Sequence, residues 1–316
     1  MSRLDTDLAP TARPTEEVTM STIVFDHVSK HYGHVIALED VTVTVRPGRI
    51  TAFLGANGSG KTTSMRVLLG LSRATSGEAT IGGTPYHRLE HPLQTVGAVL
   101  DPGFHPRRTA RNHLRLAAAQ AEVPASRVDE LLGLVGLEGA ARRWVGGYSL
   151  GMRQRLALAS AMIGDPEVLV LDEPFNGLDP EGILTMRRVL REFADRGRTV
   201  FLSSHLLAEV ARSADDAVII DHGRVVSVGP VAELLAVSGP LLVTTSHAEI
   251  LGNALASQGA HVTTKSSGEL AVTGASRDTV GRTALQLGVL VTDMRNERAD
   301  LEDLFHTLTH PEGSTS

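Results

Sequence analysis

One short stretch, Gly55 to Thr63, has the residue types and spacing of a phosphate-binding loop. It reads Gly-Ala-Asn-Gly-Ser-Gly-Lys-Thr-Thr and matches G-x-x-x-x-G-K-[ST] at every fixed position. Its glycines allow backbone conformations closed to other residues, so successive N–H groups can point at phosphate oxygens. Lys61 would reach the β- and γ-phosphates of a nucleotide, and the Thr62 hydroxyl would bind Mg²⁺. The alternative is a glycine-rich turn without a ligand, but an apolar run precedes the loop and a helix is expected over 62–71.

A second stretch able to do chemistry is the acidic pair Asp172–Glu173, directly after the apolar strand expected over 168–171. Two carboxylates at the end of a buried strand are costly unless they meet a cation or handle a proton. In a phosphate-loop protein, Asp172 would hold Mg²⁺ and Glu173 would polarise the water that attacks the γ-phosphate. Solvated acids in a strand-end turn are the alternative.

Three further residues have both a structural and a functional interpretation. His205 follows the strand expected over 199–202; a single histidine is usually structural, but one at the end of a parallel strand faces the ligand crevice. Ser149 precedes the apolar helix expected over 156–163, where it could cap the helix or bind a second anion. Asp101 directly follows the strand expected over 96–100 and is the first residue of the turn sequence Asp-Pro-Gly.

Strands that alternate with helices predict a mostly parallel sheet covered on both sides, an α/β fold with its chemistry at the carboxyl ends of the strands. The remaining strands are expected over 23–28, 41–45, 50–54 and 80–82, the remaining helices over 109–137 and 181–194, and a closing hairpin over 217–220 and 224–228. Tyr32 is expected in a polar turn between His31 and Gly33.

The C-terminal part has a different pattern, which indicates a β-α-β-β-α-β unit. Strands are expected over 241–244, 261–264, 269–273 and 289–294, with helices over 247–258 and 276–287. A final helix carries Leu301, Leu304, Phe305 and Leu308 as one apolar stripe, for core packing or for a partner. We expect a mobile tail over 1–20, a first domain over 21–235 and an accessory α+β domain over 236–316.

Composition excludes several classes of function. A net charge of -6, with seven Phe, three Tyr and one Trp, disfavours nucleic acid as a partner. The absence of cysteine excludes disulfides and thiolate metal sites. No run approaches the roughly 18 apolar residues of a membrane-spanning helix, and the N-terminus lacks the apolar region of a signal peptide, so we expect a soluble chain.

Taken in order, these motifs resemble those of ATP-binding cassette (ABC) nucleotide-binding subunits over about residues 21–235. Gly55 to Thr62 is similar to the Walker A loop, Leu169 to Glu173 to the Walker B strand, and Tyr148 to Met152 stands at the signature position. Asn176 to Asp179 falls at the D-loop, His205 at the switch histidine, and Tyr32 at the aromatic that stacks on adenine.

The resemblance implies a P-loop NTPase cassette with antiparallel β and helical subdomains, followed by a small ferredoxin-like domain, and ATP and Mg²⁺ as cofactors. It implies Glu173, His205 and Lys61 as catalytic residues, and Thr62, Asp172 and Asp101 around the metal. The residues that would contact ATP are Tyr32, Gly55, Asn57, Gly58, Ser59, Gly60, Lys61, Thr62, Thr63, Ser149, Gly151 and Asp179.

Two departures from the family pattern stand out. Leu150 and Met152 replace the first Gly and the Gln of the usual Leu-Ser-Gly-Gly-Gln signature, and Asp101 stands where a Gln that senses the metal is usual. Both are similar to the drug-export-like branch, in which the transmembrane permease is a separate polypeptide. The C-terminal module resembles the same branch.

The resemblance thus implies an ATPase subunit that powers an exporter. It would act as a dimer of two identical copies on the cytoplasmic face of the cell membrane, held there by its permease. A soluble ABC ATPase of translation or DNA repair is the alternative. Translation-type members usually carry two cassettes in one chain, and repair-type members insert long coiled coils between Lys61 and Ser149; this chain has neither. A kinase or GTPase with the same loop would not need Ser149, Asp179 and His205 in this order.

Overall fold

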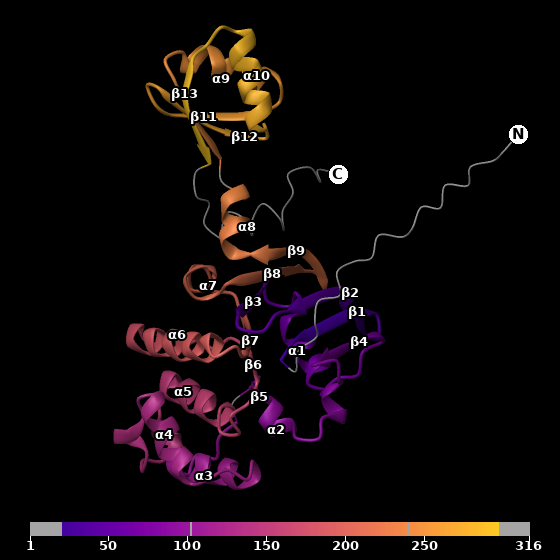
Figure 1. The fold of residues 1–316 in the computed structure, drawn as a ribbon, viewed down its shortest axis with the longest axis vertical. Coiled ribbons are helices and arrows are strands. Elements are labelled where there is room, and N and C mark those ends of the chain that lie inside the picture. The colour runs from indigo at the N-terminus through magenta and orange to yellow at the C-terminus, as the bar shows by residue number, and fades with distance from the viewer. Residues whose placement is uncertain (1–20, 102, 239, 297–316) are drawn as a thin grey trace, which may run out of the picture.

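The computed structural model describes residues 21–101, 103–238 and 240–296 (Figure 1). The expected tail over 1–20 and the apolar stripe of Leu301 to Leu308 lie outside the described residues. Within the described residues, no helix is long and apolar enough to cross a membrane.

A six-stranded sheet carries the chemistry-bearing loops. Its strand order is β5-β6-β7-β3-β8-β9, parallel except for the antiparallel pair of β8 and β9. Its strands are β5 (Val96–Val99), β6 (Val168–Leu171), β7 (Thr199–Ser204), β3 (Ile50–Leu54), β8 (Asp216–Asp221) and β9 (Arg224–Pro230). Because the carboxyl ends of β3, β5, β6 and β7 meet at one edge, the loops that follow them are neighbours there.

Alternate residues of the central strands pack into two different cores, which explains their uninterrupted apolar sequences. Leu169 and Leu171 face one core together with helices of the chain, whereas Val168 and Val170 face the other together with an antiparallel sheet. The antiparallel sheet has the order β2-β1-β4, from β1 (Ile23–Tyr32), β2 (Val35–Val45) and β4 (Ser76–Ile81). Figure 1 shows α5 (Leu150–Ala161) and α6 (Pro180–Asp195) on one side of the six-stranded sheet, and the antiparallel sheet with α1 (Lys61–Leu68) on the other. The predicted α/β architecture is confirmed.

The helices predicted for the α/β part of the chain are present, one of them broken in two, and the helices over 92–95, 207–213 and 231–238 were not predicted. The helices of this part are α1 (Lys61–Leu68), α2 (Pro92–Thr95), α3 (Ala110–Gln120), α4 (Ser126–Leu134), α5 (Leu150–Ala161), α6 (Pro180–Asp195), α7 (Leu207–Ser213) and α8 (Val231–Ser238). The single helix expected over 109–137 is therefore two helices. Pro124 lacks the N–H that a continuous helix needs, and Glu122 has a left-handed φ of 55°.

Several predicted boundaries also differ. β2 begins at Val35 and β4 at Ser76, earlier than the expected starts at residues 41 and 80. Tyr32 is the last residue of β1, paired with Val35, rather than a residue of the turn. Helix α5 begins at Leu150, six residues before the apolar run that suggested it, because the Ser149 hydroxyl caps it by accepting from the Met152 N–H at 3.2 Å.

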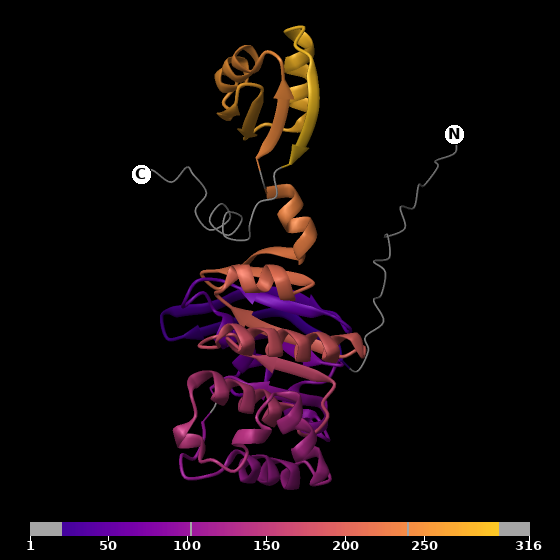
Figure 2. The ribbon, with the colours of Figure 1, turned by 90° about the vertical axis from the view of Figure 1, so that its left-hand side faces the viewer.

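The C-terminal unit has the predicted β-α-β-β-α-β order. It comprises β10 (Leu241–Thr245), α9 (Ala248–Ser257), β11 (His261–Ser266), β12 (Glu269–Thr273), α10 (Arg277–Gln286) and β13 (Val291–Asn296). The antiparallel sheet order β11-β12-β10-β13 is that of a ferredoxin-like fold, and the two helices pack on the sheet over a core of their own. Figure 2 shows this unit beyond α8, at the end of the molecule away from α3 and α4.

Candidate nucleotide site

The loop between β3 and α1 has a backbone that only glycine permits at two of its positions. A Cβ on Gly55 would lie 2.3 Å from Ser59 Oγ and 2.5 Å from the Ile220 carbonyl oxygen. Gly60 has a φ of +114°, and a Cβ there would lie 2.7 Å from the Ala37 carbonyl oxygen. These close approaches bring the loop against neighbouring strands and set the direction in which α1 begins.

Lys61 is the cation of this loop, and its side chain is only 6% exposed. The ammonium donates hydrogen bonds to the carbonyl oxygens of Gly55 at 2.7 Å and Ala56 at 3.1 Å, and lies 3.8 Å from Glu173 Oε1. Burial lowers the pKa of the Lys61 ammonium, while the carboxylates of Glu173 and Asp172 act in the opposite direction. The charge of Lys61 is thus held inside the loop, facing the acidic pair.

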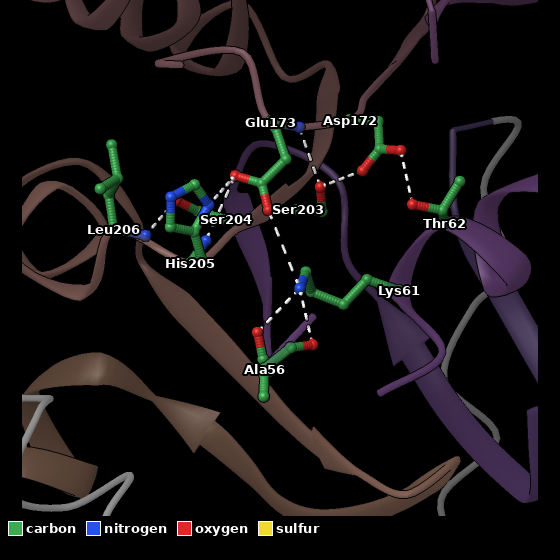
Figure 3. Close-up of polar contacts among 10 residues, drawn as sticks. Ala56, Lys61, Thr62, Asp172, Glu173, Ser203, Ser204, His205 and Leu206 are labelled. Carbon is green, nitrogen blue, oxygen red and sulfur yellow. Dashed lines mark hydrogen bonds and ion pairs between the residues drawn. The ribbon is translucent and has the colours of Figure 1, made fainter. Parts of the chain in front are cut away.

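Asp172 is held by hydroxyl groups from two other elements. Thr62 Oγ1, at the start of α1, donates to Asp172 Oδ2 at 2.7 Å, and Ser203 Oγ, at the end of β7, donates to Asp172 Oδ1 (Figure 3). A hydroxyl and a carboxylate at this distance form an all-oxygen donor set, which is the kind that Mg²⁺ prefers.

Glu173 has an unusual backbone for a residue with a side chain. Its φ of 50° is left-handed, a conformation that costs about 1 to 3 kcal/mol and persists only where the surroundings impose it. Its N–H donates to Ser203 Oγ at 2.9 Å. Its carboxylate accepts from the His205 N–H at 3.3 Å, and Oε2 lies 2.8 Å from His205 Nδ1 (Figure 3). Ser203 on β7 therefore holds the backbone of the strained turn, and His205, directly after β7, holds the carboxylate, which lies between His205 and Lys61.

Ser203 was not among the predicted site residues, although it contacts both acids. The position of Ser203 in the sequence could have indicated this role. Ser203 comes at the end of a strand expected to be buried and parallel, and the two acids follow another strand of the same kind, so their ends are expected to be neighbours. Its hydroxyl donates to Asp172 and accepts from the Glu173 N–H. Ser203 therefore fixes the relative positions of the two carboxylates.

A cavity of about 200 Å³ opens beside these residues. Its lining comprises Ala37, Asn57, Gly58, Gly60, Lys61, Thr62, Thr63 and Glu173. All of them except Ala37 were predicted as site residues. Ser59, which was also predicted, lies behind the loop with 4% of its surface exposed. The cavity thus combines loop N–H groups, one buried cation and one carboxylate.

Other predicted residues do not join this cluster within the described chain. Asp179 caps α6 by accepting from the Gly182 N–H at 3.0 Å, as Ser149 caps α5. Gly151 lies against the loop before Asp179, since a Cβ on it would be 3.2 Å from the Gly177 carbonyl oxygen. Ser149 and Asp179 are both exposed and neither bonds to Lys61 or Glu173. Ser149 and Asp179 instead mark a second surface, where the N-termini of α5 and α6 lie side by side.

Asp101 and Tyr32 also stand apart from the cluster. The Asp101 carbonyl oxygen accepts from the Gly103 N–H at 2.8 Å, so the predicted turn is present. Its carboxylate is exposed and makes no hydrogen bond or ion pair within the described residues. Because Val99 pairs with Leu171, this carboxylate is at the same sheet edge as the acidic pair. Tyr32 is 48% exposed, with its hydroxyl 3.0 Å from Ser72 Oγ.

Comparison with known families gives two matches along the chain. The profile of the family described as ABC transporter matches residues 38–176, which include the phosphate loop and the acidic pair. A domain of unknown function, DUF8746, matches residues 240–302.

Curated relatives are ATP-binding proteins of transport systems. The bacitracin transport ATP-binding protein BcrA of Bacillus licheniformis is 41% identical over 210 residues, covering 65% of this chain and 69% of that protein. BcrA of Enterococcus faecalis is 34% identical over 292 residues, 90% of this chain and 94% of that protein. The Nod factor export ATP-binding protein I of Burkholderia orbicola is 36% identical over 67% of this chain and 72% of its own length.

A solved structure described as the ATP-binding subunit of an ABC transporter superposes with a TM-score of 0.60 at 30% identity. The match covers 67% of this chain and 91% of that one. The α/β part of the fold is therefore shared with a known ATP-binding subunit.

Proposed function

Because this chain belongs to the ABC transporter family as an ATP-binding subunit, we propose that it hydrolyses ATP to power export through a separately encoded transmembrane permease. The observation that carries the proposal is that Lys61, Thr62 and Glu173 line one cavity. Asp172 lies beside it, hydrogen-bonded to the Thr62 hydroxyl. The relatives are named for different cargoes, bacitracin and Nod factor. They support export as the shared activity, and we propose that the permease determines which molecule is exported.

The residues in and around the cavity would have different roles in hydrolysis. Loop N–H groups and the Lys61 ammonium bind the β- and γ-phosphates, because two backbone carbonyl oxygens already hold the cation beside the cavity. Glu173 accepts the proton of the attacking water, and His205 holds its carboxylate through Nδ1 at 2.8 Å. Tyr32 stacks on the base.

Magnesium fits the oxygen donors of Thr62 and Asp172, next to the cavity. The Thr62 hydroxyl and the Asp172 carboxylate would hold it, and Ser203 keeps that carboxylate in place. The ion, when bound, supplies positive charge that offsets the negative charge on the phosphates.

A second copy of the chain completes each site in this proposal. Ser149 and Asp179 are exposed, and in their own chain they only cap helices. An exposed helix N-terminus attracts an anion, so Ser149 and Gly151 of one copy would face the γ-phosphate held by Lys61 of the other. The pair would dock on its permease at the cytoplasmic face of the membrane.

The direct test of the proposed function is to tag the chain in its native cell, purify it from the membrane fraction and identify the integral protein that accompanies it. The proposal predicts a transmembrane permease at a fixed ratio to the chain, and ATPase activity in the purified complex. Recovery with ribosomes or DNA-repair proteins, and with no permease, would instead support the soluble alternative.

Asp101→Asn is expected to raise the Mg²⁺ concentration needed for half-maximal ATPase activity. The carboxylate lies at the sheet edge beside the acidic pair, and we propose that it approaches the metal, directly or through one water, when the dimer closes. Asparagine keeps the size but loses the charge. ATP affinity without metal should change little. Asp278→Asn on α10 is the matched control, and a magnesium titration identical to the parent's would leave Asp101 as a turn residue only.

A further inference from the structure

The end of the β1–β2 hairpin carries exposed apolar side chains around Tyr32. Val35 pairs directly with Tyr32 across the hairpin and is 64% exposed, and Ile36 is 49% exposed. Apolar side chains in water are a cost unless they meet a ligand or a partner. Ala37, the next residue along β2, lines the cavity of the phosphate loop. The hairpin end is therefore continuous with the phosphate site.

Lys30 covers one face of the Tyr32 ring. Its ammonium lies 4.6 Å from the ring centroid and donates a hydrogen bond to the Arg73 carbonyl oxygen at 2.8 Å. The Tyr32 hydroxyl lies 3.0 Å from the Ser72 hydroxyl oxygen. The ring is thus held by a cation over its face and by a hydrogen bond at its edge.

Arg73, which accepts the Lys30 hydrogen bond, and Ser72, which bonds the Tyr32 hydroxyl, both belong to the segment that follows α1, the helix that begins at Lys61. Thr75 ties the same segment to β1, because its N–H donates to the Ser29 carbonyl oxygen at 2.8 Å and its hydroxyl accepts from the His31 N–H at 2.9 Å. These bonds fix the distance between the aromatic ring and the phosphate loop at the other end of α1. The ring is positioned before any nucleotide arrives.

We propose that Lys30 is a positioning residue for the base end of the bound nucleotide. It occupies one face of Tyr32, holds the ring against the segment after α1 and leaves the opposite face for a purine base. This inference rests on the proposed function, because it needs a nucleotide whose phosphates lie at Lys61. It adds a residue that acts on the nucleoside and not on the phosphates.

The physics of the contact supports a separate effect on the nucleoside. A cation over an aromatic face is attracted by the ring quadrupole and restricts the ring to one orientation. Stacking of a base on an aromatic ring gains most when the ring is already held, because less side-chain entropy is lost on binding. Loss of the cation should therefore weaken binding of ATP, which has a base, and leave inorganic triphosphate unaffected.

The experiment measures binding of ATP and of inorganic triphosphate to the full-length chain by isothermal titration calorimetry. Lys30→Met keeps the length of the side chain and removes its charge. We expect ATP affinity to fall by about threefold to tenfold and triphosphate affinity to stay unchanged. Lys30→Arg, which can also lie over a ring and donate to a carbonyl, should restore ATP affinity. Lys265→Met, in the C-terminal unit, is the matched control.

A second pair of variants separates positioning from general structure. In a Tyr32→Ala background, Lys30→Met should cause no further loss of ATP affinity, because there is no ring left to hold. An unchanged ATP affinity in Lys30→Met, an equal loss for triphosphate, or additive losses with Tyr32→Ala would each overturn the inference. Binding of ATP by the parent chain tests the proposed function by itself, so its absence would show that the proposed function is wrong, which the Lys30 variants alone would not.

Discussion

Glu173→Gln is expected to reduce ATP turnover by on the order of 10²-fold or more while ATP still binds, because a general base is lost and the shape of the site is kept. The glutamine amide can fill the space between His205 and Lys61, but it cannot accept a proton from water. Phosphate release under saturating Mg²⁺ and ATP measures the first effect, and ATP affinity by calorimetry measures the second. With hydrolysis blocked, ATP should also hold two copies together.

The matched control for this prediction is Glu249→Gln on α9, which removes an exposed carboxylate outside the cavity. It should hydrolyse ATP at the rate of the parent chain. Hydrolysis at the full rate by Glu173→Gln would refute the role given to Glu173, and its left-handed backbone would then need another explanation.

Lys61→Ala should abolish tight binding of ATP, with a dissociation constant larger by roughly tenfold to a hundredfold, as for loss of a charge-assisted hydrogen bond to a buried site. The loop keeps its N–H groups but loses the cation that lies among the Gly55 and Ala56 carbonyl oxygens. Calorimetry with ATP, and separately with inorganic triphosphate, measures the loss. Both ligands should weaken alike, because Lys61 acts on phosphates only.

Two controls accompany this measurement. Lys265→Met tests for a general effect of removing a lysine, and a thermal unfolding curve shows whether Lys61→Ala is folded. Lys61→Arg should fail to restore affinity, because a planar guanidinium does not fit where a compact ammonium is enclosed. An unchanged dissociation constant for folded Lys61→Ala would refute the assignment of this loop.

The cluster at the sheet edge was predictable from the sequence because its members are encoded locally. The loop motif fixes Lys61 and Thr62, and uninterrupted apolar runs mark the strands that deliver Asp172, Glu173 and His205. Parallel pairing then brings the strand ends together, and the structure places these residues within hydrogen-bond or ion-pair distance of one another.

Contacts between side chains of different strands could not be predicted in the same way. The bridge of Ser203 between two carboxylates depends on strand register, and the position of Lys30 over Tyr32 depends on rotamers and on the segment after α1. Pro124 indicates the interruption between α3 and α4, but the apolar spacing around it led us to predict helix over the whole range 109–137. Local signals therefore predicted which residues cluster at the sheet edge, and tertiary packing decided which other groups contact them.

In the proposed dimer Ser149 would have two compatible roles. Its hydroxyl caps α5, and the same exposed helix end can meet a phosphate of a second copy. Ser149→Asp separates these roles, because aspartate caps a helix as well as serine does but repels a phosphate. Ser149→Thr keeps both the cap and a neutral hydroxyl and is the matched control.

The most direct test of the central claim, that two copies share each ATP, is the ATPase activity of a mixture of Ser149→Asp and Lys61→Ala chains with different affinity tags. Each pure variant should be inactive. In a mixed dimer one site carries both defects and the other carries none, so activity should reappear in the fraction purified through both tags. If mixed dimers are isolated in this way and their activity never exceeds that of the pure variants, the shared-site account is contradicted.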